Sequence, residues 1–216
     1  MSQKVSLKET EQRVFRFVYQ DGLWDICIGS FVLVFAIAPF LSHSLGDFWS
    51  TAVFVPFWAI VFAVAWLVRK RVVVPRVGIV TFGSWRKARM LTFSVVVLVF
   101  GLISLVLGFL SAVFFDAVPG WVHAARFSFI ILVGFSLAGY FTGFKRLYLY
   151  GLLIALAPLA GEWFYTHTNI PHHGYPVTFG LTAGIAICIG LVKFIQVVRN
   201  HPLPDETPFA QEANGG

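Results

Sequence analysis

Apolar residues fall in long runs along the chain, separated by short polar segments. A helix that crosses a bilayer needs about 17 to 25 mostly apolar residues, and six runs approach or reach that length. They cover residues 23–41, 52–68, 91–115, 127–144, 147–165 and 177–198. The pattern predicts an all-α integral membrane protein in which residues 23–198 form one transmembrane domain of six helices.

The segment before the first run is polar and basic. Residues 1–22 place the apolar residues of 14–18 beside Arg13 and Arg16. Such a mixture is typical of an amphipathic helix that lies along the membrane surface. We therefore expect a cytoplasmic amphipathic arm ahead of the first span.

Two other polar segments are long enough to matter. A basic loop covers residues 69–90, and the alternation of apolar and polar residues over 76–82 within it predicts a short strand or hairpin. Residues 199–216 form a polar tail that ends in two glycines. Neither segment is long enough for a separate folded domain.

Basic residues predict how the chain is threaded. All of the 16 lysines and arginines except Arg126 precede the first span, fill the 69–90 loop, occupy positions 145–146 or border the tail. Because lysine and arginine near span ends are retained on the cytoplasmic side, both termini are predicted to be cytoplasmic. The net charge of +6 then reflects topology, and no nucleic-acid partner is expected. We expect the cytoplasmic membrane of a prokaryote as the location.

Small residues recur at intervals of four within the spans. This spacing lets membrane helices approach closely, so it predicts a compact bundle and would also suit a homodimer. The stripes are Ser104, Gly108 and Ala112 in the third span, Gly134 with Ala138 and Gly139 with Gly143 in the fourth, and Gly180, Gly184 and Cys188 in the sixth.

Composition excludes several classes of protein. Apolar residues make up 58% of the chain and charged residues 12%, whereas soluble domains carry about 25% charged residues. The centres of the predicted spans hold no acidic or basic residue, which argues against ion-coupled pumps. No Cys-x-x-Cys, P-loop, dinucleotide fingerprint or Gly-x-Ser-x-Gly motif occurs, so enzymatic activity is not the favoured expectation.

Two acidic residues lie at the start of the first span. Asp21 and Asp25 are four positions apart and share one helix face. Both could simply favour the helix amino terminus, but Asp25 lies one turn deeper and needs a partner such as Arg76 or Lys145. An ionisable group set into a membrane bundle is a site candidate. These four residues therefore form the inner-face candidate site.

The basic loop is a second candidate surface. Basic clusters beside a span attract anionic lipid headgroups at about 1 kcal/mol per residue, and the same charges could bind a partner protein. The residues are Arg69, Lys70, Arg71, Arg76, Arg86, Lys87 and Arg89.

Histidines gather on the side predicted to be external. Glu162, His167, His172 and His173 fall within one short stretch, and imidazole with carboxylate can bind zinc or copper. The spacing matches no zinc signature, and a polar external loop explains the same residues. No cofactor other than this metal is expected.

Three functions are compatible with these patterns. The first is a small permease or channel for a neutral or weakly charged solute, with a polar cavity near Asp25. The second is a non-catalytic regulatory or assembly subunit of a membrane complex that acts through the basic loop 69–90. The third is a metal-dependent membrane enzyme that uses the external histidines and acids.

Overall fold

The computed structural model describes residues 21–77, 84–114, 119–168 and 172–201. Every regular element in these ranges is helical, which confirms the all-α prediction. The predicted amphipathic arm up to residue 20 and the tail beyond residue 201 lie outside the described residues.

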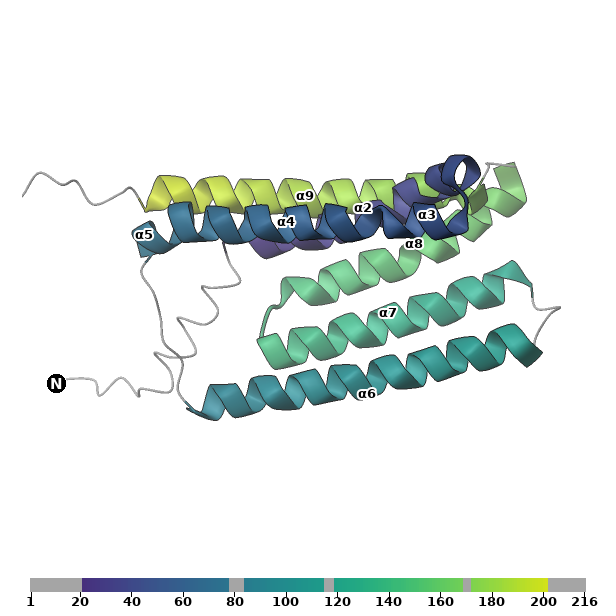
Figure 1. Ribbon diagram of the computed structural model, residues 1–216, viewed down its shortest axis with the longest axis horizontal. Helices are drawn as coiled ribbons and strands as arrows, with labels where there is room; N and C mark the ends of the chain where they lie inside the picture. Colours follow the sequence, from purple (N-terminus) through teal and green to yellow (C-terminus); the bar gives the residue numbers. More distant parts are fainter. Residues whose placement is uncertain (1–20, 78–83, 115–118, 169–171, 202–216) are drawn as a thin grey trace, which may run out of the picture.

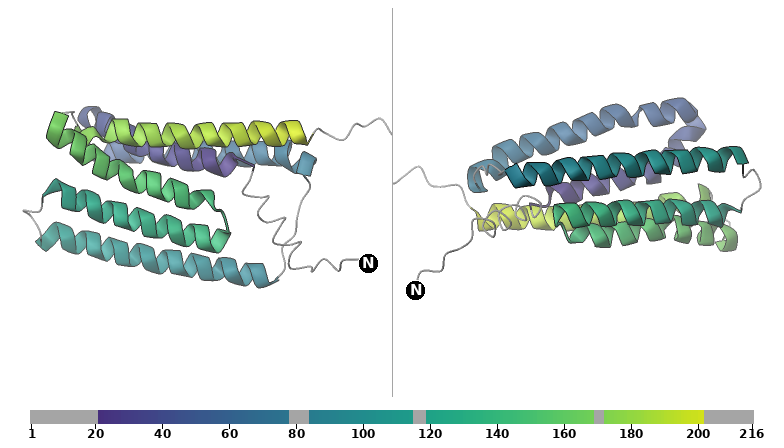
Figure 2. Two further views of the ribbon diagram at one scale, coloured as in Figure 1. Left: turned by 180° about the vertical axis from the view of Figure 1, so that it is seen from behind. Right: turned by 90° about the horizontal axis from the view of Figure 1, so that it is seen from below.

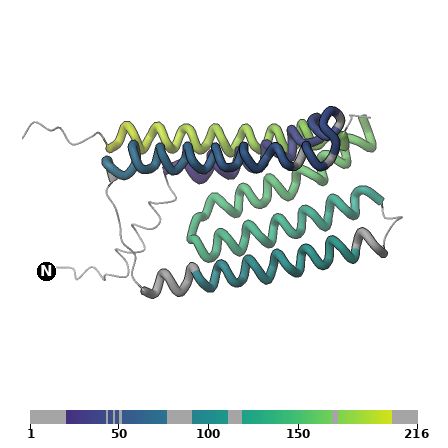
Figure 3. Tube along the Cα trace, viewed as in Figure 1, coloured from purple at the N-terminus to yellow at the C-terminus, as the bar shows by residue number. Residues whose placement is uncertain are grey.

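Long helices run side by side along the long axis of the molecule (Figures 1 and 3). The elements, in chain order, are α2 Leu23–Leu45, α3 Asp47–Ala52, α4 Phe54–Val68, η1 Arg69–Val73, α5 Val74–Val77, α6 Ser84–Phe114, α7 Gly120–Thr142, α8 Arg146–Thr168, η2 His172–Gly174 and α9 Tyr175–Asn200.

Each predicted span coincides with one of these helices. Five helices, α2, α6, α7, α8 and α9, are long and apolar enough to cross a membrane. The 15 residues of α4 are fewer, but η1 and α5 continue it as helix to Val77. Helix α7 begins seven residues before the predicted position 127, because His123 and Arg126 interrupt the apolar run without interrupting the helix.

The basic segment is more helical than expected. Residues 69–77 continue the second long helix, and α6 takes in residues 84–90. Arg76 and Val77 are therefore helical rather than part of a hairpin, and positions 78–82 of that prediction lie outside the described residues. Lysine and arginine are good helix formers, and Pro75 directly follows the π-helical turn Arg69–Val73, a local change of helix geometry within the continuous helix.

Helices α2, α8 and α9 form the centre of the molecule. The most extensive helix pair is α2 with α9, followed by α7 with α8 and α8 with α9. The amino end of α2, the amino end of α8 and the carboxyl end of α9 meet at one end of the bundle, called here the Asp25 end. The opposite end, where α8 turns into α9, is called the Glu162 end (Figure 1).

Three glycines allow the close contact of α2 with α9. A Cβ at Gly22 would overlap the carbonyl oxygen of Gly190, and a Cβ at Gly190 would lie 2.8 Å from the Gly22 carbonyl oxygen. A Cβ at Gly29 would lie 2.6 Å from the Ile187 side chain. Gly22 also has a φ of 82°, which favours glycine. The bundle at the Asp25 end is therefore packed backbone against backbone.

The predicted compact bundle holds for α2, α7, α8 and α9 but not for the whole chain. None of the apolar stretch Leu91–Leu110 of α6 is buried, and this helix packs along α7. At Gly108 and Gly184, from the predicted stripes, a Cβ would meet no described atom within 4 Å. Small residues bring helices together only on a face that meets a partner, and these two face outward. Figure 2 shows α4 on the opposite side of α2 from α7 and α8.

Candidate functional site

Asp25 is fully buried and bound by two groups from α8. Its Oδ2 lies 2.7 Å from Nη1 of Arg146, which donates a hydrogen bond and forms an ion pair. Its Oδ1 accepts a hydrogen bond of 2.6 Å from the hydroxyl of Tyr150. We call these three residues the Asp25 cluster. Both carboxylate oxygens thus have a charged or polar donor, which a buried carboxylate requires.

Helix periodicity places the members of the Asp25 cluster. Asp25, Val32 and Ala36 share one face of α2 and are all buried. On α8, Arg146 and Tyr150 are one turn apart, and the same face continues to Ile154 in the hydrophobic core. The cluster therefore lies at one edge of the apolar core that α2, α8 and α9 share.

Asp21 is buried beside this cluster but is less well satisfied. Its Oδ1 accepts a hydrogen bond of 3.1 Å from the Leu23 amide, which caps the start of α2. Its Oδ2 is buried and finds no hydrogen-bond partner among the described residues. Burial raises the pKa of the Asp21 carboxyl to about 6, against the opposing effects of the Leu23 amide and of Arg69.

The two basic residues proposed as partners of Asp25 lie elsewhere. Arg76 donates a hydrogen bond of 2.7 Å from Nη1 to the Val72 carbonyl oxygen on its own helix. Lys145 is exposed, and its neighbour Arg146 makes the ion pair instead. Of the four inner-face candidates, Asp21 and Asp25 lie in the same region. The ion pair with Asp25 is made by Arg146 and not by Arg76 or Lys145.

The basic surface is described only in part. Lys70 and Arg71 lie on η1, where Arg71 is exposed and Nζ of Lys70 lies 5.1 Å from the centre of the Trp66 ring. Arg69 is partly buried and lies near Asp21. Arg86, Lys87 and Arg89 fall in the first turns of α6, and their side chains lie outside the described part.

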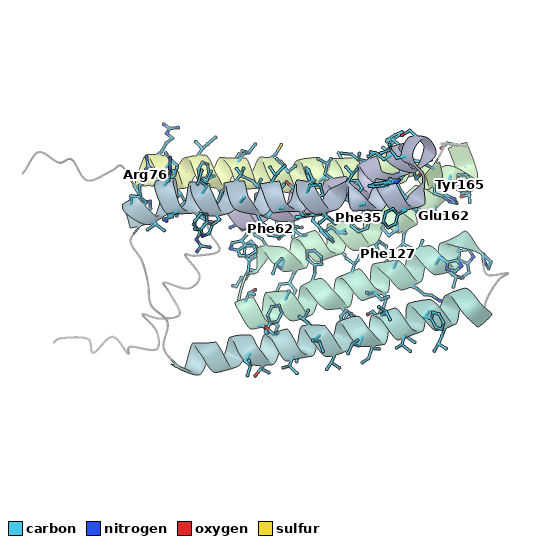
Figure 4. All side chains as sticks on the ribbon, in the orientation of Figure 1. Phe35, Phe62, Arg76, Phe127, Glu162 and Tyr165 are labelled. Atoms are coloured by element: carbon cyan, nitrogen blue, oxygen red, sulfur yellow. The ribbon has the colours of Figure 1, made fainter. Side chains whose placement is uncertain are left out.

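A second acid–base pair lies at the Glu162 end. Nδ1 of His173 lies 2.9 Å from Oε2 of Glu162, a buried residue whose carboxylate faces Gly120 at the start of α7. The His173 side chain is 47% exposed. Its ring stacks between Tyr165, at 4.2 Å between ring centres, and Tyr175, at 5.6 Å. Figure 4 labels Glu162 and Tyr165 at this end of the bundle.

The other two histidines of the proposed metal site point to different neighbours. His167 stacks on Trp163 at 4.8 Å, and His172 contacts the Phe40 ring at 5.5 Å. Within the described ranges, no group of three or more His, Cys, Asp or Glu could hold a metal ion. The structure thus joins Glu162 with His173 and separates His167 and His172 from them.

A cleft of about 490 Å³ opens in the half of the bundle nearer the Glu162 end. It is lined by residues of α2, α7 and α9 and by Pro158 of α8. Phe35 of α2 and Phe127 of α7 point toward one another at 5.8 Å between ring centres (Figure 4). The described lining residues are Phe35, Ala38, Pro39, Ser42, His123, Ala124, Phe127, Pro158, Tyr175 and Phe179.

The cleft is distant from the Asp25 cluster. Phe35 is ten residues beyond Asp25 on α2, which is about 15 Å along a helix axis. Between them, Val32 of α2, Ile154 of α8 and Ala183 of α9 fill the core. The described cleft thus lies further along the same helices than the polar cavity expected beside Asp25, and its lining is mostly apolar.

Comparison with protein-family models, with curated proteins and with solved structures found no match for this chain. The candidate site is therefore defined by geometry alone.

Two features of the site were missed in the sequence. Arg146 and Tyr150 are four positions apart at the start of an apolar run, a spacing that puts a donor pair on one helix face. The sequence signal for the cleft was weaker. It consists of Pro39 and Pro158, which lie inside two helices and line the cleft.

Proposed function

We propose that this chain is an integral membrane protein with six spans and with the Asp25 end in the cytoplasm. Its five long apolar helices support membrane insertion, and α4 with its helical continuation serves as the remaining span. The basic residues of η1, Arg146 and Arg199 lie at the Asp25 end, whereas Arg126 is on the first half of α7. This distribution follows the positive-inside pattern.

Within that frame, the function we propose is a permease for a small neutral solute. The observation that carries the proposal is a contrast along the bundle. Helices α2, α7, α8 and α9 line a cleft nearer the Glu162 end, whereas the described residues pack closely at the Asp25 end. A cleft that is open toward one side and sealed toward the other is what an alternating-access protein presents in one of its states. The Asp25 cluster is the contact that must break for the sealed half to open.

Two prolines give α2 and α8 a place to bend. Pro39 and Pro158 both lie within their helices and both line the cleft. A proline removes one backbone hydrogen bond and kinks a helix. Bending at these positions would move the two halves of α2 and α8 relative to each other, with the cleft at the pivot.

Accessibility of a single cysteine from each side of the membrane tests this proposal. With Cys27 and Cys188 replaced by alanine, Ala38→Cys places a thiol in the cleft. We expect a membrane-impermeant maleimide to label it from the external side, and Asp25→Asn to increase labelling from the cytoplasmic side several-fold. Ile37→Cys, one position away and 38% exposed as isoleucine, is the control that should not respond to Asp25→Asn. Cytoplasmic labelling that stays at background in the Asp25→Asn variant would contradict the permease.

A second function, as an assembly subunit, is favoured by one observation. The apolar stretch of α6 is unburied, and Gly101 and Gly108 on it have open space around them. Close approach of a partner helix there would use small residues as membrane helices commonly do. Disulfide cross-linking of Gly108→Cys in membranes tests for a second copy, and absence of any cross-link to itself or to a co-purifying subunit would weaken this function.

A further inference from the structure

We infer that the cleft binds a lipophilic amphiphile with one uncharged hydrogen-bonding head, and that this molecule enters from the bilayer between α2 and α7. The identification of this amphiphile as the transported solute rests on the proposed function. Binding itself requires only the geometry of the cleft.

The size of the cleft suits a single small amphiphile. Ligand pockets in proteins measure about 300 to 1,000 Å³ and are lined mainly by hydrophobic and aromatic side chains with a few polar groups. At about 490 Å³ the cleft falls within this range. It is too small for a two-chain phospholipid to be enclosed, so the occupant is a smaller molecule.

Aromatic rings make a continuous apolar wall. Phe35 contacts Phe179 at 5.4 Å between ring centres, and Phe179 contacts Tyr175 at 5.9 Å. With the Phe35 to Phe127 contact, the four rings connect α2, α7 and α9. Aromatic walls accept the chain or ring of an apolar body through face and edge contacts. This wall is the site of the amphiphile's apolar part.

Polar atoms gather at the edge of the cleft. His123 lies in the first turn of α7, and Ser42 lies in the last turn of α2. The Ser42 hydroxyl donates to the Pro39 carbonyl oxygen at 3.0 Å, so its oxygen lone pairs can accept another hydrogen bond. The imidazole of His123 can donate or accept. A hydroxyl head can use both groups.

The head group should carry no charge. The described lining contains no Asp, Glu, Lys or Arg, and an ion set against apolar walls without a counter-charge is strongly disfavoured. His123 and Ser42 lie near the helix ends, and Phe35 and Phe179 lie deeper. An amphiphile that is oriented like a membrane lipid, with its head outward, therefore meets the polar and apolar groups in the correct order.

Entry from the bilayer follows from an exposed ring of the cleft lining. Phe127 of α7 lines the cleft and is 37% exposed. In the proposed topology this ring contacts lipid. A molecule dissolved in the outer part of the membrane can move past it into the cleft without passing through water.

Photolabelling in proteoliposomes tests the inference. Three probes share one sixteen-carbon chain with a diazirine and an alkyne, and differ in their heads: an alcohol, a carboxylic acid and an amine. We expect the alcohol to label peptides that contain residues 35–42 and 123–127 several-fold more than the charged probes. Ala38→Trp, which fills the cleft, should remove this labelling, whereas Ile37→Trp on the adjacent exposed position should leave it unchanged.

Several results would overturn the inference. Equal labelling by all three heads, or labelling that survives Ala38→Trp in folded protein, indicates ordinary lipid contact. If Ala38→Trp does not fold, His123→Leu replaces it, and unchanged alcohol labelling in that variant contradicts the polar head site. Selective labelling with a failed cysteine-accessibility test would support the binding site and contradict the permease. Unselective labelling with a successful cysteine-accessibility test would contradict the binding site and support the permease.

Discussion

The two ends of α8 each bring an acid and a base together, but in different surroundings. At one end, the fully buried Asp25 binds Arg146 and Tyr150, with the Arg146 side chain only 22% exposed. At the other end, buried Glu162 meets His173, which is about half exposed and held between two tyrosine rings. Arginine stays charged at any ordinary pH, and the Asp25 pair is the more deeply buried of the two.

The two pairs at the ends of α8 should therefore differ in their contribution to stability. The Asp25 cluster is a permanent ion pair in a close-packed interface, so removing one partner strands a buried charge. In the Glu162 pair, the His173 side chain is 47% exposed. The Asp25 cluster should therefore contribute more to stability than the Glu162 pair.

The largest effect is expected from Arg146→Leu. This change leaves Asp25 buried without its counter-charge, a loss that costs about 3–5 kcal/mol in comparable pairs. Thermal unfolding of the purified protein in detergent measures it, with Lys145→Leu as the exposed control. The double variant Asp25→Leu with Arg146→Leu should recover much of the loss, because no charge then remains buried. Equal destabilisation by Lys145→Leu and Arg146→Leu would refute the assigned pair.

Asp21 should make stability depend on pH at the same end. Its pKa is about 6 in the folded protein against an ordinary value of 3.8, so the folded state holds the proton more tightly than the unfolded state. The contribution of Asp21 to stability is then fully present below about pH 4 and is lost as the pH rises through 6, by up to about 3 kcal/mol at 1.36 kcal/mol per unit. Asp21→Asn should remove this slope in unfolding measured between pH 4 and 7.5. A variant with the same slope as the unchanged chain would show that another group titrates.

Tyr150→Phe isolates the hydrogen bond from the ion pair. Loss of the hydroxyl leaves Oδ1 of Asp25 without its donor, and hydrogen bonds to charged groups contribute about 1.5–3 kcal/mol. The same detergent unfolding assay measures the loss. Tyr148→Phe, an exposed tyrosine on the same helix, should cost little, and the prediction is wrong if both variants behave alike.

Glu162→Gln should have the smallest effect. A pair with a partly exposed partner contributes about 0–1 kcal/mol. The same detergent unfolding assay should show a loss no larger than this, and His167→Gln serves as the control outside the pair. A loss as large as that of Arg146→Leu would mean that the two ends do not differ as described.

Particular residues show how far the sequence could predict this arrangement. The depth of Asp25 in an apolar run was enough to require a buried partner, since an unpaired carboxylate is too costly there. The partner itself depended on which face of α8 meets α2, and that is set by side-chain packing over the whole interface. Arg146 therefore pairs with Asp25 although Lys145 is adjacent to it in the chain.

The glycines give the same result for packing. Four-residue spacing singled out Gly134 and Gly139, which face Phe100 and Tyr148 on neighbouring helices. It also singled out Gly108 and Gly184, which face open space, and passed over Gly22 and Gly190, which lie in close contact. Spacing identifies a row of small residues on one helix face, but the rotation of that helix in the bundle decides whether the row contacts another helix.

Sequence by itself determined the helical class, the placement of the long helices and the presence, near the start of α2, of a carboxylate that needs a buried partner. These follow from local quantities: the length of apolar runs, the helical period and the cost of a buried charge. Tertiary structure alone decided that Arg146 and Tyr150 bind Asp25, that Glu162 meets His173 while the other histidines turn away, and that a cleft forms beside Pro39 and Pro158. Each of these depends on helix rotation and on contacts between residues far apart in the chain, which no local pattern specifies.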